Sequence, residues 1–148
     1  METKEKIERL MESAIDCELE GVELFSRHGF SVIRESYNGI GPEFFSPAVR
    51  EKVTQFLALF EPAALIHDVR NEFSDGTRYS FNLANYEFLA NCERLADEAY
   101  AWWRPRRYIA RSVARILFDF VSGAPGWRAW KEAKERHEKK MNQNGGMK

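Results

Sequence analysis

The stretch Pro62–Leu89, PAALIHDVRNEFSDGTRYSFNLANYEFL, decides the fold of this chain. It reads as two helices joined by a turn at Ser74–Thr77, whose Ser-Asp-Gly-Thr sequence is typical of tight connections. Apolar residues recur at helical spacing on both sides of the turn, over about 62–73 and about 81–103. Because the connection is short, we expect the two helices to lie antiparallel.

Three polar residues stand out within this predicted helix pair. His67 and Asp68 are adjacent on the first helix, and Asn85 falls on the apolar line of the second. A buried amide costs about 1–3 kcal/mol unless its hydrogen bonds are made, so Asn85 needs a polar partner across the pair. His67 lies at a comparable distance from the turn, and we therefore predict a hydrogen bond between His67 and Asn85. The pattern alone leaves open whether His67 is a core residue or a catalytic base.

The composition is that of a globular protein of one domain. The chain has 148 residues, of which 44% are hydrophobic and 30% charged, with a net charge of −1. This balance provides no overall attraction to nucleic acid or acidic lipid. We expect a single helical domain over 1–140 and a disordered tail over 141–148.

The two cysteines and the first residues predict a cytoplasmic location. Cys17 and Cys92 are far apart in the sequence and suit reduced or buried thiols better than a disulfide framework. The charged start METKEKIERL has no apolar signal segment, and no apolar run reaches the roughly 18 residues of a membrane span.

The rest of the chain predicts a mainly α fold. We expect five or six helices around the antiparallel pair and at most a short β element near 30–36. The first helix is expected from Thr3 to about His28. Pro62 should break one helix and start the next, because proline disfavours helical geometry at the residue before it. Between the β element and the following helix lies a glycine-containing loop, 37–42.

A second candidate site is a basic stripe next to two tryptophans. Arginines recur three or four positions apart beside Trp102 and Trp103, at Arg104, Arg107, Arg111 and Arg115. Such a stripe could dock on lipid headgroups, nucleic acid or an acidic protein surface. The alternative is a solvated face that pairs with the acidic first helix. The near-neutral total charge argues against nucleic acid.

The sequence resembles a family of small phage and prophage proteins of unknown function. The resemblance rests on three stretches between about 37 and 130, which are Ala63–Asp68 (AALIHD), Ala84–Phe88 (ANYEF) and Gly126–Trp130 (GWRAW). It leaves the first predicted helix outside.

More distantly, the chain is similar to secretory phospholipases of the A-two class. That resemblance implies His67 as general base, Asp68 as a calcium ligand with backbone carbonyls around Gly39 and Gly41, and Asn85 at the position of the acid that orients the histidine. In such a site the base takes a proton from water and the cation stabilises the oxyanion of the ester. The chain departs from the pattern, because an amide replaces the orienting acid and the family's disulfides cannot form from Cys17 and Cys92.

These departures favour a non-catalytic structural or interaction module of phage or mobile-element type that keeps a phospholipase-like helix pair. The alternative is a calcium-dependent lipid ester hydrolase. We expect an unknown protein partner. A membrane surface and a homodimer are also left open.

Overall fold

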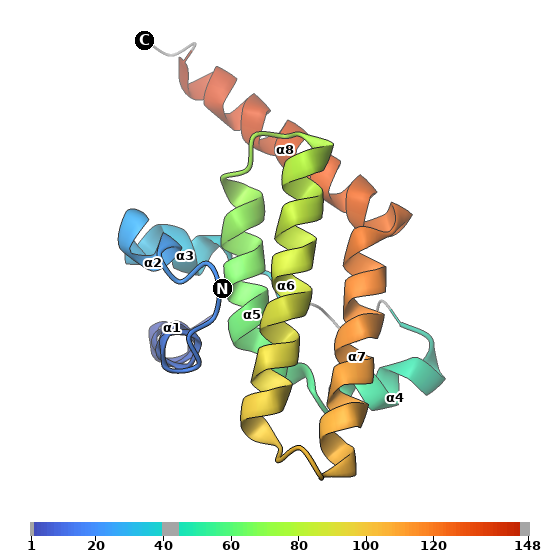
Figure 1. The fold of residues 1–148 in the computed structure, drawn as a ribbon. Helices are drawn as coiled ribbons and strands as arrows, with labels where there is room; N and C mark the ends of the chain where they lie inside the picture. Colours follow the sequence, from blue (N-terminus) through green and yellow to red (C-terminus); the bar gives the residue numbers. More distant parts are fainter. Residues whose placement is uncertain (1, 40–44, 146–148) are drawn as a thin grey trace.

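The computed structural model describes residues 2–39 and 45–145, and these form a helical fold (Figure 1). The prediction of a mainly α protein is confirmed, with eight helices in the described part of the chain where five or six were expected. The helices are α1 (Lys4–Asp16), α2 (Leu24–Arg27), α3 (Phe30–Ser36), α4 (Pro47–Thr54), α5 (Leu57–Glu72), α6 (Arg78–Ala99), α7 (Pro105–Ser122) and α8 (Ala124–Gly145).

Helix α5 is the centre of the arrangement. It packs antiparallel against α6, as expected, and α6 packs in turn against α7, so that the three form one layer (Figure 1). Helices α1, α2, α3 and α4 contact α5 as well, and α8 crosses from α7 back to α5. Apolar side chains occupy most of the circumference of α5. Eight of its residues are buried, because other helices pack against it.

The turn between α5 and α6 has the chemistry that its sequence predicts. Gly76 adopts a positive φ of 84°, a conformation that side chains other than glycine rarely adopt. Thr77 caps α6 by accepting a hydrogen bond from the backbone N–H of Ser80 at 3.1 Å. Asp75 holds the turn by accepting from the backbone N–H of Thr77 at 3.0 Å.

The expected helix break at Pro62 is wrong. Helix α5 runs through Pro62, which is buried, and the chain bends earlier, between α4 and α5, at Gln55–Phe56. Proline removes one helical hydrogen bond, but burial of Phe60, Ala63 and the residues after them on several sides stabilises the continuous helix.

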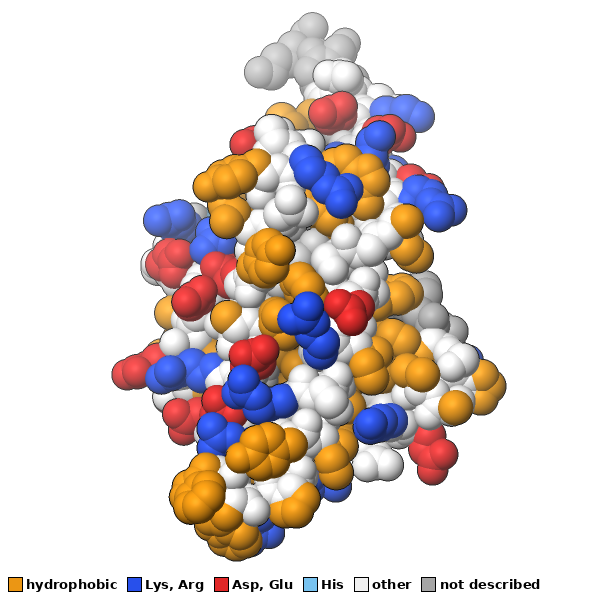
Figure 2. Space-filling view, turned by 45° about the vertical axis from the view of Figure 1, so that its right-hand side comes forward, with side chains coloured by type: hydrophobic (Ala, Val, Ile, Leu, Met, Phe, Trp, Pro, Cys, Tyr) orange, Lys and Arg blue, Asp and Glu red, His pale blue; other side chains and the backbone are white. Residues whose placement is uncertain are grey.

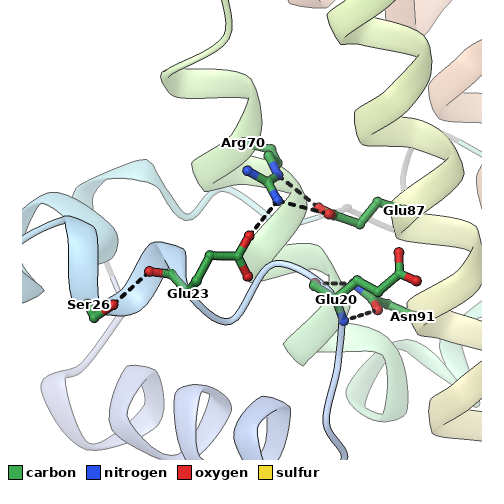
Figure 3. A network of polar contacts seen from close by, with 6 residues as sticks. All are labelled: Glu20, Glu23, Ser26, Arg70, Glu87 and Asn91. Atoms are coloured by element: carbon green, nitrogen blue, oxygen red, sulfur yellow. Dashed lines mark hydrogen bonds and ion pairs between the residues drawn. The ribbon is translucent and has the colours of Figure 1, made fainter.

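The first helix ends earlier than expected. Helix α1 stops at Asp16, and the chain turns through Glu18 (φ 53°) and Gly21 (φ 94°) before α2. A side chain at position 21 would meet Ile66 Cγ2 on α5 at 2.6 Å, so only glycine allows this approach. Asn91 on α6 anchors the same turn, because its side chain bonds both the N–H (2.8 Å) and the carbonyl (2.9 Å) of Glu20 (Figure 3).

The segment 30–36 is a helix, α3, where at most a short β element was expected. Ile33 and Ser36, three positions apart, are its buried residues, which is the spacing of one helical face. The Ser36 hydroxyl also donates to the carbonyl of Val32 four residues earlier, at 2.8 Å. The apolar residues of this segment therefore belong to a short helix that packs against α5.

The ends of the last helices also differ from the expected boundaries. Helix α6 ends at Ala99, so Trp102 and Trp103 lie in the turn before α7. Helix α8 extends to Gly145, whereas the sequence predicts a disordered tail from 141; residues 146–148 lie outside the described part. Within the described residues, no helix is long and apolar enough to cross a bilayer.

Candidate functional site: a buried histidine–asparagine pair beside a cavity

The predicted hydrogen bond between His67 and Asn85 is present. His67 Nε2 lies 2.7 Å from Asn85 Oδ1, and both residues are buried, with 7% and 1% of their surface exposed. The short turn between α5 and α6 brings them to the same depth. The ring of Phe88, one helical turn after Asn85, covers the imidazole at a centroid distance of 4.9 Å.

The backbone of α7 determines how the pair is protonated. Asn85 Nδ2 donates to the carbonyl of Val121 at 3.4 Å, which leaves Asn85 Oδ1 to face the imidazole as an acceptor. His67 must then carry its proton on Nε2, and Nδ1 is left with a lone pair. Burial lowers the pKa of His67, opposed by its hydrogen bond to Asn85, so the ring is neutral at neutral pH.

Asp68 points to the opposite side of the imidazole and holds a loop. Its Oδ2 accepts hydrogen bonds from the backbone N–H groups of Asn38 (2.8 Å) and Gly39 (2.9 Å). Its Oδ1 lies 4.0 Å from His67 Nδ1, beyond hydrogen-bonding distance. Burial raises the pKa of Asp68 to about 7, although the two N–H donors oppose this rise.

The calcium site that the phospholipase resemblance implies stays a prediction, and the described part of its loop meets Asp68 through N–H groups. At Asn38 and Gly39 the loop offers N–H donors to Asp68, whereas a calcium ion needs oxygen ligands, and a carboxyl with a raised pKa is a weaker ligand. Across 2–39 and 45–145, no group of three or more His, Cys, Asp and Glu side chains is placed to hold a metal ion. Gly41, the other predicted loop ligand, lies outside the described residues.

A cavity of about 380 Å³ reaches the histidine and aspartate. It lies between α5, the Asn38–Gly39 loop, the end of α7 and the first half of α8. Its walls also carry Asn71 on α5 and Trp130 on α8, two residues that the sequence did not single out as site residues. Trp130 belongs to the Gly-Trp-x-Ala-Trp stretch, so the only available signal for it was a motif without an assigned role.

The arginine stripe is largely neutralised by acids of the neighbouring helix α6, and not by the first helix. Arg107 pairs with Asp97 at 2.9 Å, and Arg111 pairs with both Asp97 (2.9 Å) and Glu93 (3.2 Å). Arg115 pairs within α7 with Asp119 at 3.6 Å.

At the start of the stripe the side chains are exposed, and an arginine contacts an aromatic ring. Arg104 stacks on the ring of Trp103 at 5.1 Å, and Trp102 and Trp103 are 73% and 62% exposed. Hydrophobic side chains gather at this end of the molecule, where α6 leads into α7 (Figure 2). The predicted surface residues thus separate into an exposed aromatic part and an ion-paired part.

The comparisons with known proteins add no relative. The chain matches no protein-family model, and no curated protein or solved structure matches it at a significant level.

Proposed function

We propose that this protein is a non-catalytic helical interaction module that binds a protein partner through an exposed aromatic tip. The aromatic tip consists of Trp102, Trp103, Tyr108 and Ile109, which are 41–73% exposed although they are large and apolar. Exposed tryptophan and tyrosine side chains in one place are typical of the anchors of protein interfaces. This cluster is the observation that carries the proposal.

The aromatic tip is held in place before any partner binds. The Tyr108 hydroxyl donates to the carbonyl of Trp102 at 2.7 Å, and the Arg104 guanidinium lies over the ring of Trp103 at 5.1 Å. Contacts that order a surface in advance reduce the entropy lost on binding. This favours a protein interface over a segment that orders only on binding.

The charges around the tip indicate the kind of protein surface that would fit. Arg104 and Arg106 lie over aromatic rings. Arg107 and Arg111 form ion pairs with carboxylates of α6. A partner with an apolar groove and a few acidic groups at its edge would complement the tip. Nucleic acid or a strongly anionic membrane would need more unpaired cations than this surface offers.

The buried polar residues support a structural role. His67 Nε2 is hydrogen-bonded to Asn85, and the Asn85 amide donates to a backbone carbonyl of α7. The Asp68 carboxylate accepts hydrogen bonds from the Asn38–Gly39 loop. Together these hydrogen bonds fix the relative positions of α5, α6, α7 and one loop, which a scaffold requires without any catalysis. The resemblance to phage proteins and the two free cysteines lead us to propose a phage or mobile-element origin and a cytoplasmic location.

The experiment is an affinity purification from extracts of cells that produce the protein, followed by calorimetry with the purified partner. The variant Trp102→Ala/Trp103→Ala is compared with Leu83→Ala/Tyr86→Ala, a matched pair of residues on α6 that are 51% and 63% exposed. We expect the tip variant to weaken the complex at least about tenfold and the control to leave it unchanged. Equal affinity in both variants, or binding to anionic vesicles in place of a protein, would contradict the proposal.

The second candidate is an ester hydrolase, favoured by the cavity that reaches His67. The lone pair on His67 Nδ1 could act as a general base, but Asn85 cannot stabilise the resulting imidazolium by charge. Asn85→Asp restores that charge and should raise hydrolysis of short-chain nitrophenyl esters if the site is catalytic. An unchanged rate supports the interaction module.

A further inference from the structure

The wall of the cavity beside His67 carries two hydrogen-bond acceptors that no described residue uses. His67 Nδ1 keeps its lone pair, because the ring proton is on Nε2 and is donated to Asn85. Asp68 accepts the two loop N–H groups with Oδ2, and its Oδ1 makes no hydrogen bond within the described part of the chain. Both residues line the cavity, and their side chains keep 9% and 16% of their surface exposed. Asn71 Oδ1 and Trp130 Nε1 are also unpaired, but these two atoms are closed off from the open space.

One donor group can reach both acceptors. His67 Nδ1 and Asp68 Oδ1 are 4.0 Å apart. A nitrogen atom placed about 2.8–2.9 Å from each, the usual hydrogen-bond distance, has the two acceptors at an angle of about 90°. This angle is close to the tetrahedral spread of the N–H bonds of an ammonium group, so two of its hydrogens can point at the two acceptors. A hydroxyl group has one hydrogen and can serve only one of them.

The charges around Asp68 favour a cation over a neutral ligand. Burial raises the pKa of Asp68 to about 7, the two loop N–H groups oppose this rise, and no cation among the described residues contributes to it. The two bases of the cavity wall, Lys134 and Arg136, are therefore too far from the carboxylate to neutralise it. Lys134 donates instead to the carbonyls of Glu72 (2.8 Å) and Ser74 (3.2 Å). A buried carboxylate without a counter-ion is costly, and a bound cation offsets that cost.

The rest of the cavity wall is mostly apolar and has room for the body of a ligand. At about 380 Å³ the cavity falls in the lower part of the range typical of small-molecule pockets, roughly 300–1,000 Å³. A cavity of roughly 150 Å³ is enough to hold benzene, so a phenyl-sized group fits here beside an ammonium group. The apolar lining comes from Phe81, Val121, Pro125, Ala129, Trp130 and Ala133.

We propose that this cavity binds a small primary amine in its ammonium form, with an apolar alkyl or aromatic body. The ammonium group donates one hydrogen bond to His67 Nδ1 and one to Asp68 Oδ1, and its charge pairs with the Asp68 carboxylate. The body lies against Phe81, Val121 and the alanines of α8. A quaternary ammonium ion does not fit, because it has no N–H to donate. This site is separate from the aromatic tip and does not depend on the function proposed for it.

The test uses benzylamine as the probe, on the full-length protein at about pH 8, where both the amine and Asp68 are charged. Benzyl alcohol has the same body without the charge, and N,N-dimethylbenzylamine keeps the charge but has a single N–H. Calorimetry measures the three affinities. We expect benzylamine to bind at least about tenfold more tightly than either analogue, because the alcohol lacks the charge and the tertiary amine lacks the second donor. Equal affinity for benzylamine and either analogue would overturn the proposal.

A matched pair of variants separates the Asp68 contact from the general charge of the cavity. Asp68→Asn removes the charge and keeps a side-chain oxygen, and Glu72→Gln removes one negative charge from the same cavity wall. Asp68→Asn should weaken benzylamine binding at least about tenfold, and Glu72→Gln less than about threefold. Equal losses in the two variants would show an unspecific attraction of cations and overturn the proposal.

A measurement on the unchanged protein locates the amine without relying on the folding of any variant in the site. The ring nitrogens of His67 are followed in a long-range ¹H–¹⁵N spectrum, assigned by substituting the other two histidines, His28 and His137. Benzylamine should shift the Nδ1 signal, since this nitrogen becomes a hydrogen-bond acceptor, and shift the Nε2 signal much less. An unchanged Nδ1 signal at the highest soluble benzylamine concentration would overturn the proposal.

Discussion

Helices α5 and α6 are joined by two polar links that differ in charge and in their exposure to solvent. His67 and Asn85 form a neutral hydrogen bond that is almost completely buried. One helical turn along, Arg70 forms two hydrogen bonds with Glu87, at 3.0 and 3.1 Å, and one with Glu23 beside α2, at 3.1 Å (Figure 3). Arg70 and Glu23 keep 30% and 48% of their side-chain surface exposed.

The comparison teaches that the charged link is not the stronger one. If a partner of Arg70 is lost, water can solvate the guanidinium, whereas a lost partner of His67 leaves a buried polar atom without a hydrogen bond. We therefore expect the neutral pair to control the stability of the helix pair and the ion pairs to contribute little.

The largest effect is expected for Asn85→Ala. The change leaves His67 Nε2–H without an acceptor and opens a small cavity, so the free energy of unfolding should fall by about 3–4 kcal/mol. Urea unfolding followed by circular dichroism measures this. The control His67→Leu/Asn85→Leu removes both polar partners and should be less destabilising than Asn85→Ala. A loss below about 1 kcal/mol for Asn85→Ala would show that the buried link is as weak as a surface pair.

Asp68 sharpens the comparison, because it is a charged group in a buried position. Its pKa is raised from 3.8 to about 7, so the folded state binds the proton more tightly than the unfolded state. The stabilisation from protonated Asp68 is complete below pH 4 and is lost as the pH rises through about 7. Between pH 4 and 7 the wild type should therefore lose about 2–3 kcal/mol relative to Asp68→Asn.

Measuring the difference between the two proteins isolates Asp68. The lowered pKa of His67 acts in the opposite direction, since stability falls as the pH drops below the unfolded pKa of histidine, but it is present in both proteins. The amide introduced by Asp68→Asn retains a side-chain oxygen to accept from the loop N–H groups. A pH-independent difference would mean that the Asp68 carboxylate is well solvated.

The smallest effects are expected at the Arg70 cluster. Glu87→Gln removes the more buried carboxylate and should cost about 1 kcal/mol, whereas Glu23→Gln should cost less than about 0.5 kcal/mol. Both losses should shrink in high salt, while the loss in Asn85→Ala should not. The opposite order, with Glu23→Gln more destabilising than Asn85→Ala, would reverse the comparison.

Several features could be predicted because they depend on neighbouring residues. The turn at Ser74–Thr77, the antiparallel helices on either side of it, and the pairing of His67 with Asn85 follow from local turn chemistry, helical spacing and the cost of burying an amide. The prediction at Pro62 is wrong because it used neighbouring residues alone. The local effect of proline on the helix is real, but it is smaller than the gain from packing α5 as one helix.

The sequence by itself determined the helical class, the central helix pair and its buried polar contact, because period and polarity are properties of short segments. Only the tertiary structure decided where the N-terminal helix ends, since Gly21 turns there against Ile66 of a helix far along the chain. It alone also placed Trp130 and Asn71 at one cavity and divided the arginine stripe into ion-paired and exposed parts. These outcomes depend on contacts between distant segments, and no local pattern specifies which side chains those contacts bring together.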